Sequence, residues 1–321
     1  MNILVAGGAG YIGSVFVEEA CNAGHNVTVF DSLVEGHRAA VNERARFVQG
    51  DLADRAATSQ ALKEAQAEAV FYFAGFIMVG ESMTEPGKYF RNNVSNGIEL
   101  LEACIETGVK KIVFSSTAAV FGMPDRVPIE EDFPKQPVNA YGESKLMFET
   151  LLEWYRKIHG LNYVVFRYFN AAGASASRGE AHRIETHLIP NILKVALGQK
   201  ENCAIFGTDY DTPDGTCIRD YIHVLDLASS HLLALKEGVS GSFNLGNGEG
   251  YSVREVIDTC RKVTGRDIPV LEEPRRAGDP PRLIASSRKA ITELGWKPAH
   301  PTLEEIVTTA WHWHQSHPDG Y

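Results

Sequence analysis

A glycine-rich turn near the N-terminus constrains the fold of this chain more than any other feature. Asn2–Ala6 is a short apolar run typical of a strand, and Gly7, Gly10 and Gly13 follow before a helical segment begins. Glycines here permit a tight turn, close approach of the backbone to a pyrophosphate, and close packing of the helix on the strand. The helix N-terminus offers unpaired N–H groups and the positive end of its dipole to phosphates. The turn therefore predicts a dinucleotide-binding site.

An acidic residue after the second strand indicates which dinucleotide binds. Asp31 directly follows the apolar run Asn26–Phe30. A carboxylate in this position accepts hydrogen bonds from the hydroxyls of the adenosine ribose and repels a 2′-phosphate. The sequence therefore predicts NAD, and not NADP, as the cofactor.

Strands and helices alternate along the first 170 residues. The expected strands are Asn2–Ala6, Asn26–Phe30, Ala45–Val48, Ala69–Phe73, Lys111–Ser115 and Asn162–Phe166, and the expected helices are Tyr11–Ala23, Asn93–Thr107 and Ser144–His159. Apolar strands separated by helices predict an α/β fold, a Rossmann-type doubly wound parallel sheet whose strands are buried on both faces.

The pattern changes beyond Asn170, where the segments become shorter and richer in Gly, Pro, His and Arg. We therefore expect an NAD-binding Rossmann domain in residues 1–170 and a smaller α/β substrate-binding domain in residues 171–321. Strand character returns at Ser242–Leu245, and this segment is expected to rejoin the first sheet.

Composition and charge argue against several other classes of protein. The 321 residues include 31 Lys and Arg against 41 Asp and Glu, a net charge of −10, which disfavours nucleic acid as a partner. No apolar run approaches the roughly 18 residues of a membrane span and no signal peptide is evident, so we expect a soluble, cytoplasmic protein. Five scattered cysteines without a CxxC pair, and His312 and His314 only two residues apart, predict no metal site.

Tyr141 and Lys145 are the candidate catalytic pair. Their spacing of four places both side chains on one face of a helix, one turn apart. Tyrosine, with a pKa of about 10, is a poor base at neutral pH. A nearby ammonium group and the positive nicotinamide ring favour its phenolate, and the lysine can also hold the nicotinamide ribose. The pair therefore predicts redox chemistry at a hydroxyl group.

The glycine spacing GxxGxxG and several later segments resemble the extended short-chain dehydrogenase/reductase family. These segments are Asp51-Leu52, Phe73-Ala74-Gly75, Asn92-Asn93-Val94 and Phe114-Ser115-Ser116. The resemblance implies that Thr117 hydrogen-bonds the reacting hydroxyl and the tyrosine oxygen, with Ser116 as the second candidate. The implied cofactor-binding residues are Gly7, Gly10, Tyr11, Ile12, Gly13, Asp31, Ser32, Asp51, Leu52, Phe73, Ala74, Gly75, Asn92, Ser115, Tyr141, Lys145, Tyr168 and Phe169.

Ala118 and Ala119 argue against one branch of that family. Nucleotide-sugar 4,6-dehydratases carry Asp-Glu after the threonine, as the acid and base of water elimination. Alanine side chains cannot transfer a proton, so elimination has no evident donor here. Oxidation followed by re-reduction remains.

The chain resembles the UDP-glucose 4-epimerases of this family over essentially its full length. The segments that carry the resemblance are Tyr168–Gly173, Ile205–Tyr210, Asp214–Thr216, Arg219–Val224 and Arg275–Pro280. The implied reaction is NAD-dependent 4-epimerisation of a UDP-hexose, by transient oxidation at C4 and re-reduction on the opposite face. The implied residues for the UDP-sugar are Thr117, Tyr141, Asn170, His187, Leu188, Ala204, Ile205, Phe206, Arg219, Tyr221, Arg276, Asp279 and Leu283. Two distant arginines can clamp a diphosphate, and Phe206 offers a stacking face.

Two positions depart from the pattern of these epimerases. Ile77 stands where a lysine near the cofactor phosphate is common, so cofactor retention depends on other contacts. Leu283 stands where some members carry a bulky tyrosine, so the sugar pocket is expected to be roomier. This difference suggests that the N-acetylhexosamine pair is also accepted.

Other readings of the same residues remain open. A 4-epimerase for another UDP-sugar, such as a pentose or a uronate, would carry the same glycine turn and the same Tyr–Lys pair. A net reductase and a non-catalytic NAD-binding scaffold are less consistent with Asp31 and with the intact Tyr141, Lys145 and Thr117. We also expect a homodimer, formed by the two long helices Asn93–Thr107 and Ser144–His159 as a four-helix contact.

Overall fold

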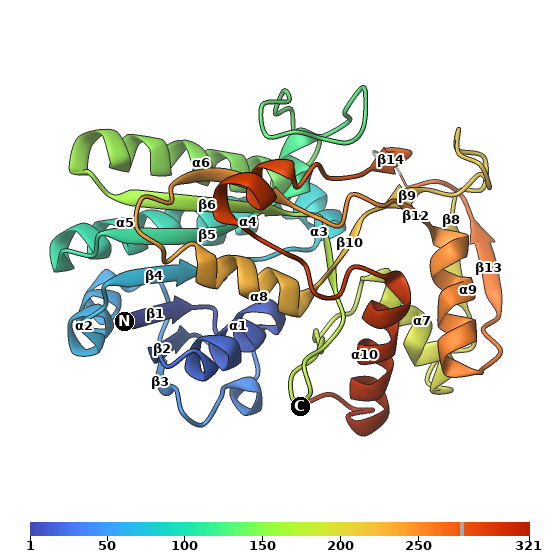
Figure 1. Ribbon diagram of the computed structural model, residues 1–321, viewed down its shortest axis with the longest axis horizontal. Helices are drawn as coiled ribbons and strands as arrows, with labels where there is room; N and C mark the ends of the chain where they lie inside the picture. Colours follow the sequence, from blue (N-terminus) through green and yellow to red (C-terminus); the bar gives the residue numbers. More distant parts are fainter. Residues whose placement is uncertain (277–278) are drawn as a thin grey trace.

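A seven-stranded parallel sheet forms the centre of the computed structural model, which describes residues 1–276 and 279–321 (Figure 1). In spatial order its strands are β11 (Gly241–Leu245), β6 (Asn162–Tyr168), β5 (Lys111–Thr117), β4 (Ala69–Tyr72), β1 (Asn2–Ala6), β2 (Asn26–Asp31) and β3 (Arg46–Gln49). Every neighbouring pair is parallel. The fold class expected from the sequence is therefore confirmed. Ala277 and Gly278, within the Arg275–Pro280 motif, lie outside the described residues.

Helices cover both faces of this sheet (Figure 1). One face carries α1 (Tyr11–Asn22) and α8 (Val224–Leu233), and the other carries α2 (Arg55–Ala65), α5 (Asn96–Thr107) and α6 (Ala140–His159). Alternate residues of β1 enter the two cores, Ile3 beneath α1 and Leu4 beneath α2 and α5, and both are fully buried. Burial on both faces explains why the strand sequences are almost wholly apolar.

Several boundaries differ from the sequence prediction. Helix α6 begins at Ala140 and not at Ser144, because the Asn139 side chain accepts a hydrogen bond from Gly142 N at 2.8 Å and caps the helix. The predicted helix Asn93–Thr107 is α5 preceded by a π-helical turn, Phe90–Ser95. Strands β5 and β6 run two residues further than predicted. Helices α2, α3 (Val79–Thr84) and α4 (Pro86–Tyr89) were not expected.

The second half of the chain builds a smaller layer of short strands and helices beside the carboxyl end of the sheet (Figure 1). Its strand pairs are β7 (Asn170–Ala172) with β10 (Tyr221–His223), and β8 (Cys203–Phe206) with β13 (Val270–Glu273); β9 (Ile218–Arg219) lies between β12 (Tyr251–Ser252) and β14 (Arg282–Leu283). Helices α7 (Leu188–Ala196), α9 (Val253–Thr264) and α10 (Leu303–Ser316) share its core. None of the helices in the described residues is both long and apolar enough to cross a membrane.

The chain passes between the two layers more than once. After β10 it returns to the first layer as α8, which packs against α1, and as β11, which pairs with β6. It then leaves again through β12 and α9. The division at residue 170 remains a prediction, and the topology places residues 224–245 with the first layer.

Candidate active site

The candidate site lies where the order of the parallel strands reverses. β1 has β2 on one side and β4 on the other, so the connections leaving their carboxyl ends diverge, and ligands of open α/β sheets bind at such a point. The glycine turn follows β1, Asp31 ends β2, and Phe73 follows β4. Segments far apart in the sequence therefore meet at one edge of the sheet.

The glycine turn has no room for side chains at two of its three glycines. A Cβ atom on Gly7, which has φ +83°, would lie 2.3 Å from the backbone nitrogen of Ala74. A Cβ on Gly13 would lie 2.2 Å from the carbonyl oxygen of Gly7. Gly10 is the N-cap of α1, whose first turn carries no acidic residue and receives no hydrogen bond from a capping side chain. This helix end therefore suits a pyrophosphate.

Asp31 is held next to that turn. Its carboxylate accepts hydrogen bonds from the backbone N–H groups of Ala9 and Leu33, both at 2.9 Å. Burial raises the pKa of Asp31, and these two N–H donors lower it in part. Each carboxylate oxygen keeps a lone pair that can accept from a ribose hydroxyl. The turn and this carboxylate together fit NAD.

Other predicted cofactor residues follow the same strands, and their side chains differ in burial and in hydrogen-bond partners. Tyr11 donates from its hydroxyl to the carbonyl of Gly173 at 2.6 Å. Ile12 and Phe73 pack on one core, and Leu52 and Ala74 on the other. Asp51 is exposed, and its carboxylate accepts a hydrogen bond from Ala53 N at 2.9 Å. Ser32 directly follows Asp31 at the end of β2. Asn92 donates to Asn93, which spans from the Phe76 backbone near Gly75 to Ser144 of α6.

Thr117 and Tyr141 meet at the end of β5. Thr117 is the last residue of the strand, and Tyr141 lies in the first turn of α6. Burial raises the pKa of Tyr141, and a hydrogen bond with Thr117 lowers it in part. The protein alone therefore leaves Tyr141 protonated at neutral pH, and a positive charge nearby is needed to favour the phenolate.

Lys145 lies one helical turn beyond Tyr141 and is 3% exposed. Its ammonium group donates to the carbonyl of Ser115 at 2.9 Å and lies 4.8 Å from the ring centre of Phe114. Burial lowers the pKa of Lys145 to about 7, while Glu149 acts in the opposite direction. A cation in this position lies on the helix face that carries Tyr141.

Ser116, the second candidate for the hydroxyl role, is committed elsewhere. It is 2% exposed and donates to Glu149 at 2.6 Å. Glu149 also forms a buried ion pair with Arg167 of β6, with 2.7 Å between the closest atoms. Sequence analysis missed this network, although Glu149 lies four residues after Lys145 on the same helix face. Thr117, next in the strand, remains the candidate that faces Tyr141.

Four of the predicted substrate residues, Arg219, Asp279, Arg276 and Phe206, make contacts with one another on the smaller layer. The guanidinium of Arg219 lies 3.6 Å from the carboxylate of Asp279 and donates to the carbonyl of Pro280 at 2.8 Å. The guanidinium carbon of Arg276 lies 3.9 Å from the ring centre of Phe206. The backbone N–H of Asp279 donates to the carbonyl of Arg276 at 3.4 Å, so the two contacts join into one group of two arginines, one acid and one aromatic face.

Other substrate candidates lie around this group. In β8 the side chain of Ile205 is buried in the core, whereas Ala204 and Phe206 point to the other face, so Ile205 can reach a ligand only through its backbone. Leu283 pairs with Arg219 across β14 and β9, and packs on the apolar cluster that contains Val120 and Phe121. Asn170 and Tyr221 are paired across β7 and β10. Tyr168 ends β6 and bonds to buried His231, and Phe169 follows it.

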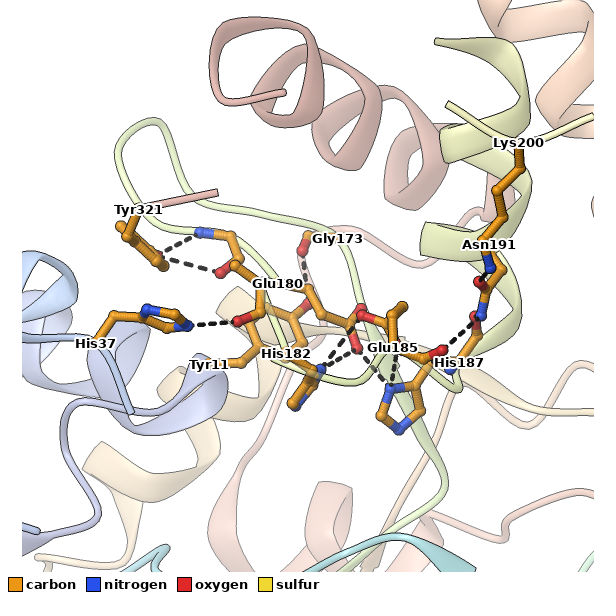
Figure 2. A network of polar contacts seen from close by, with 12 residues as sticks. Tyr11, His37, Gly173, Glu180, His182, Glu185, His187, Asn191, Lys200 and Tyr321 are labelled. Carbon is orange, nitrogen blue, oxygen red and sulfur yellow. Dashed lines mark hydrogen bonds and ion pairs between the residues drawn. The ribbon is translucent and has the colours of Figure 1, made fainter. Parts of the chain in front are cut away.

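His187 and Leu188 lie at the start of α7. Figure 2 shows that the imidazole of His187 is directed at the carboxylates of Glu180 and Glu185, beside His182. Sequence analysis singled out His187 for the substrate, and it missed the three residues that contact it.

Comparison with known proteins identifies the family. Residues 3–246 match the NAD dependent epimerase/dehydratase family. The chain belongs to this family. The UDP-glucose 4-epimerase of Streptococcus mutans serotype c is 53% identical over 100% of this chain and 99% of that protein. A crystal structure of UDP-glucose 4-epimerase is 50% identical, with a TM-score of 0.97 over 99% of both chains. The UDP-glucose 4-epimerase from Brucella ovis in complex with NAD is 43% identical, with a TM-score of 0.94 over 97% of this chain and 98% of that one.

These matches confirm the resemblance to UDP-glucose 4-epimerases that the sequence suggested. They also confirm two further predictions from the sequence. The chain is an enzyme of the isomerase class, and its cofactor is NAD. Within the family pattern, Ile77 is 36% exposed and lies just before α3. An apolar side chain there offers no charge to a phosphate.

Proposed function

We propose that this epimerase/dehydratase family member is a UDP-hexose 4-epimerase that interconverts UDP-glucose and UDP-galactose with recycled NAD. The observation that carries the proposal is the meeting of Thr117 and Tyr141 beside Lys145, in a protein whose smaller layer groups Arg219 with Arg276. Redox groups alone fit many substrates, and two arginines beside an aromatic ring suit a nucleoside diphosphate. Relatives of the same name that match over the full chain length support this choice.

In the proposed mechanism Tyr141 is the general base and general acid. Its phenolate takes the proton of the sugar 4-hydroxyl while Thr117 orients that hydroxyl by hydrogen bonding. NAD, when bound, would supply the redox chemistry as the acceptor and donor of the C4 hydride. Tyr141 then gives its proton back to the oxygen of the 4-keto sugar, so no proton or electron is gained or lost overall. Lys145 stabilises the phenolate by its charge.

The group on the smaller layer is proposed to hold the nucleotide during these steps. Arg219 and Arg276 can bind the two phosphates, Phe206 can stack on the base, and Asp279 can accept from the ribose. The sugar must present both faces of C4 to the same cofactor. Binding strength concentrated in the nucleotide leaves the sugar ring free to turn, which this reaction requires.

Substitution of Tyr141 tests the proposal. We expect Tyr141→Phe to lower kcat by about 10²- to 10⁴-fold, the usual contribution of a positioned acid–base group. UDP binding should persist, because the arginine group is untouched. Tyr155→Phe, on the same helix but bonded to Glu102, is the matched control and should keep normal turnover. Conversion of UDP-galactose is followed by NMR. Normal turnover in Tyr141→Phe would refute this base, and stoichiometric release of NADH would indicate a net oxidoreductase.

Leu283 favours a second substrate pair, the N-acetylhexosamines. Its branched side chain packs on the cluster of Val120 and Phe121, which lie in the short helical turn Ala118–Phe121 just after Thr117. A tyrosine in this position would extend further toward the sugar, and leucine leaves that volume open. We expect slow conversion of UDP-N-acetylgalactosamine by the native enzyme, and its loss in Leu283→Tyr with UDP-galactose turnover retained. If the native enzyme at high concentration does not convert UDP-N-acetylgalactosamine, the proposal that it accepts N-acetylhexosamines is wrong.

We further propose that the enzyme is a homodimer that pairs through α5 and α6. Met147, Trp154 and Ile158 of α6 are 43%, 54% and 68% exposed. Their spacings of seven and four residues place them in one stripe along the helix. An exposed apolar stripe of this kind is typical of an interface.

A further inference from the structure

Residues 173–187, called the strap below, link β7 to α7 and lie against the loops of the cofactor edge. The Tyr11 hydroxyl donates to the carbonyl of Gly173, and His37 contacts the carbonyl of Ala181 at 2.7 Å. The guanidinium of Arg183 donates to the carbonyls of Leu33, Val34 and Gly36. The strap therefore connects the glycine turn and the loop after β2 to the first residues of α7.

Four metal-ligating side chains converge within the strap. Glu180, His182, Glu185 and His187 each offer one ligand atom, and these four atoms lie within 4.8 Å of one another. Nδ1 of His187 lies 2.8 Å from Glu180 and 2.9 Å from Glu185. Nδ1 of His182 lies 3.3 Å from Glu180 and 3.4 Å from Glu185. Figure 2 shows both imidazoles directed at both carboxylates.

Hydrogen bonding accounts for only part of this arrangement. One Nδ1 carries one hydrogen, so each imidazole can donate a linear bond to one of the two carboxylates. Both rings contact Glu185 in hydrogen-bond geometry. The contacts of both rings with Glu180 are ion-pair contacts. Two of the four short approaches are therefore not explained by the protons that the rings can supply.

A tetrahedral cation explains why these four side chains converge on one point. Bonds of about 2.0–2.1 Å to nitrogen and oxygen give neighbouring ligand atoms about 3.3 Å apart. Oε1 of Glu180 lies 3.3 Å from Nδ1 of His182 and 2.8 Å from Nδ1 of His187. The two rings approach different oxygens of Glu185, His187 at 2.9 Å from Oε1 and His182 at 3.4 Å from Oε2. One oxygen from each carboxylate and one nitrogen from each ring lie within 4.8 Å of one another, so an inward adjustment completes such a shell.

The charges of the cluster also balance around a divalent cation. The side chains of Glu180 and Glu185 are 5% and 3% exposed, so two negative charges are buried together. A dication with two neutral imidazoles and two carboxylates is neutral overall and leaves no buried charge uncompensated.

We propose that Glu180, His182, Glu185 and His187 form a structural binding site for a divalent transition metal ion, with Zn²⁺ the best fit to this ligand set. The ion fixes the strap between the glycine turn and α7, whose N-cap is His187. Four protein ligands leave no open position for a reacting group, so the ion has no place in the redox step. This site departs from the sequence prediction of no metal.

Metal retention tests the proposal without any substrate. The purified protein, loaded with Zn²⁺ and desalted, is expected to keep one zinc ion per chain by elemental analysis. His187→Gln should retain at least tenfold less, and its ring is 42% exposed, so the substitution is compatible with folding. His312→Gln is the matched control, since His312 is an exposed histidine of α10 outside the cluster. Equal retention by His187→Gln and the native protein, or no retention by the native protein, would overturn the proposal.

Cobalt provides a second readout of the geometry. Co²⁺ in a four-coordinate site absorbs visible light far more strongly than Co²⁺ in a six-coordinate one. We expect the intense spectrum in the native protein and its loss in His182→Gln and Glu185→Gln, with native circular dichroism as the check on folding. A weak, six-coordinate spectrum in the native protein would refute the four-ligand site. Because neither assay uses a UDP-sugar, the outcome is independent of the proposed epimerase activity.

Discussion

At the scale of single residues, the setting of Lys145 makes a prediction about pH. Burial lowers its pKa to about 7 in the protein, against an ordinary value of 10.5. Between these values the unfolded chain binds a proton that the folded chain does not, so the stability conferred by this position rises with pH. Below pH 7 both states are protonated, and above about 10.5 neither is.

The matched variant Lys145→Met has no such titration. We expect the free energy of unfolding of the cofactor-free native protein to rise, relative to that of Lys145→Met, by up to about 1.4 kcal/mol per pH unit between pH 7 and 9. Denaturant unfolding of both proteins over this range measures it. A constant difference between them would show that Lys145 keeps an ordinary pKa.

The ion pair of Glu149 and Arg167 makes a second prediction at this scale. Both side chains are buried, 8% and 3% exposed, so removing the arginine leaves a carboxylate with only Ser116 as a donor from this network. We expect Arg167→Met to cost about 3–5 kcal/mol of stability. Lys262→Met breaks the exposed pair of Lys262 and Glu304 and should cost at most about 1 kcal/mol. Urea denaturation of the two variants measures their free energies of unfolding. A similarly small loss of stability in both would contradict the argument that the buried pair matters more.

Residues with local partners are those that sequence analysis can find. Tyr141 and Lys145 share one helix, and their spacing alone places them together. Glu149 and Arg167 lie on different elements and meet Ser116 only after α6 packs on the sheet, so no spacing in the sequence signals their contact. Likewise, the group around Arg219 and Arg276 was inferred from resemblance, because physical patterns do not bring residues so far apart together.

At the scale of elements, strands were easier to predict than the short helices between them. Most expected strands were largely apolar, because both faces of the central sheet are buried; the edge strand β3 contains Arg46 and is only partly buried. Helix α2 was missed since its sequence is largely polar, although Asp54 before it is a typical N-cap and accepts from Ala57 N. The π-helical turn before α5 also escaped prediction, because its irregularity arises from tertiary packing around Asn93, which spans from the Phe76 loop to Ser144.

The glycine turn yields a prediction that separates folding from cofactor binding. Gly13→Ala brings a methyl group within 2.2 Å of the Gly7 carbonyl, so we expect a stability loss of about 1–3 kcal/mol. A Cβ on Gly10 would meet its nearest neighbour, the same carbonyl, only at 3.5 Å. Gly10→Ala should therefore fold normally but bind NAD at least tenfold more weakly, because the methyl group occupies the path of the pyrophosphate.

Thermal unfolding without cofactor and calorimetric titration with NAD measure the two effects separately. Gly24→Ala, whose Cβ would meet no atom within 4 Å but whose φ is +81°, controls for backbone strain alone. NAD affinity unchanged in Gly10→Ala would place the pyrophosphate away from this helix end.

At the scale of the whole molecule, the two layers depend on each other for completion. The chain leaves the sheet after β6, builds β7, the strap and α7, and then returns through α8 and β11 before leaving again. The change of composition near Asn170 predicted a second, smaller domain, and the return of strand character at 242–245 predicted a strand that rejoins the first sheet. They could not place α8 on the first layer, because its partner α1 is more than 200 residues earlier in the chain. The site thus forms only when both layers are folded.

The exposed apolar stripe on α6 predicts the oligomeric state of the enzyme. Trp154 is 54% exposed in the single chain, so Trp154→Glu should leave the fold intact while it places a charge in the proposed dimer contact. Interfaces of stable dimers bury about 800 Å² per partner, and a buried charge near the centre of such a patch is strongly unfavourable. We expect the native protein to be a dimer at micromolar concentration and Trp154→Glu to be a monomer, as measured by light scattering after gel filtration. Ile291→Glu, which changes a 49% exposed residue outside α5 and α6, should remain dimeric. A monomeric native protein, or a dimeric Trp154→Glu, would rule out pairing through this stripe.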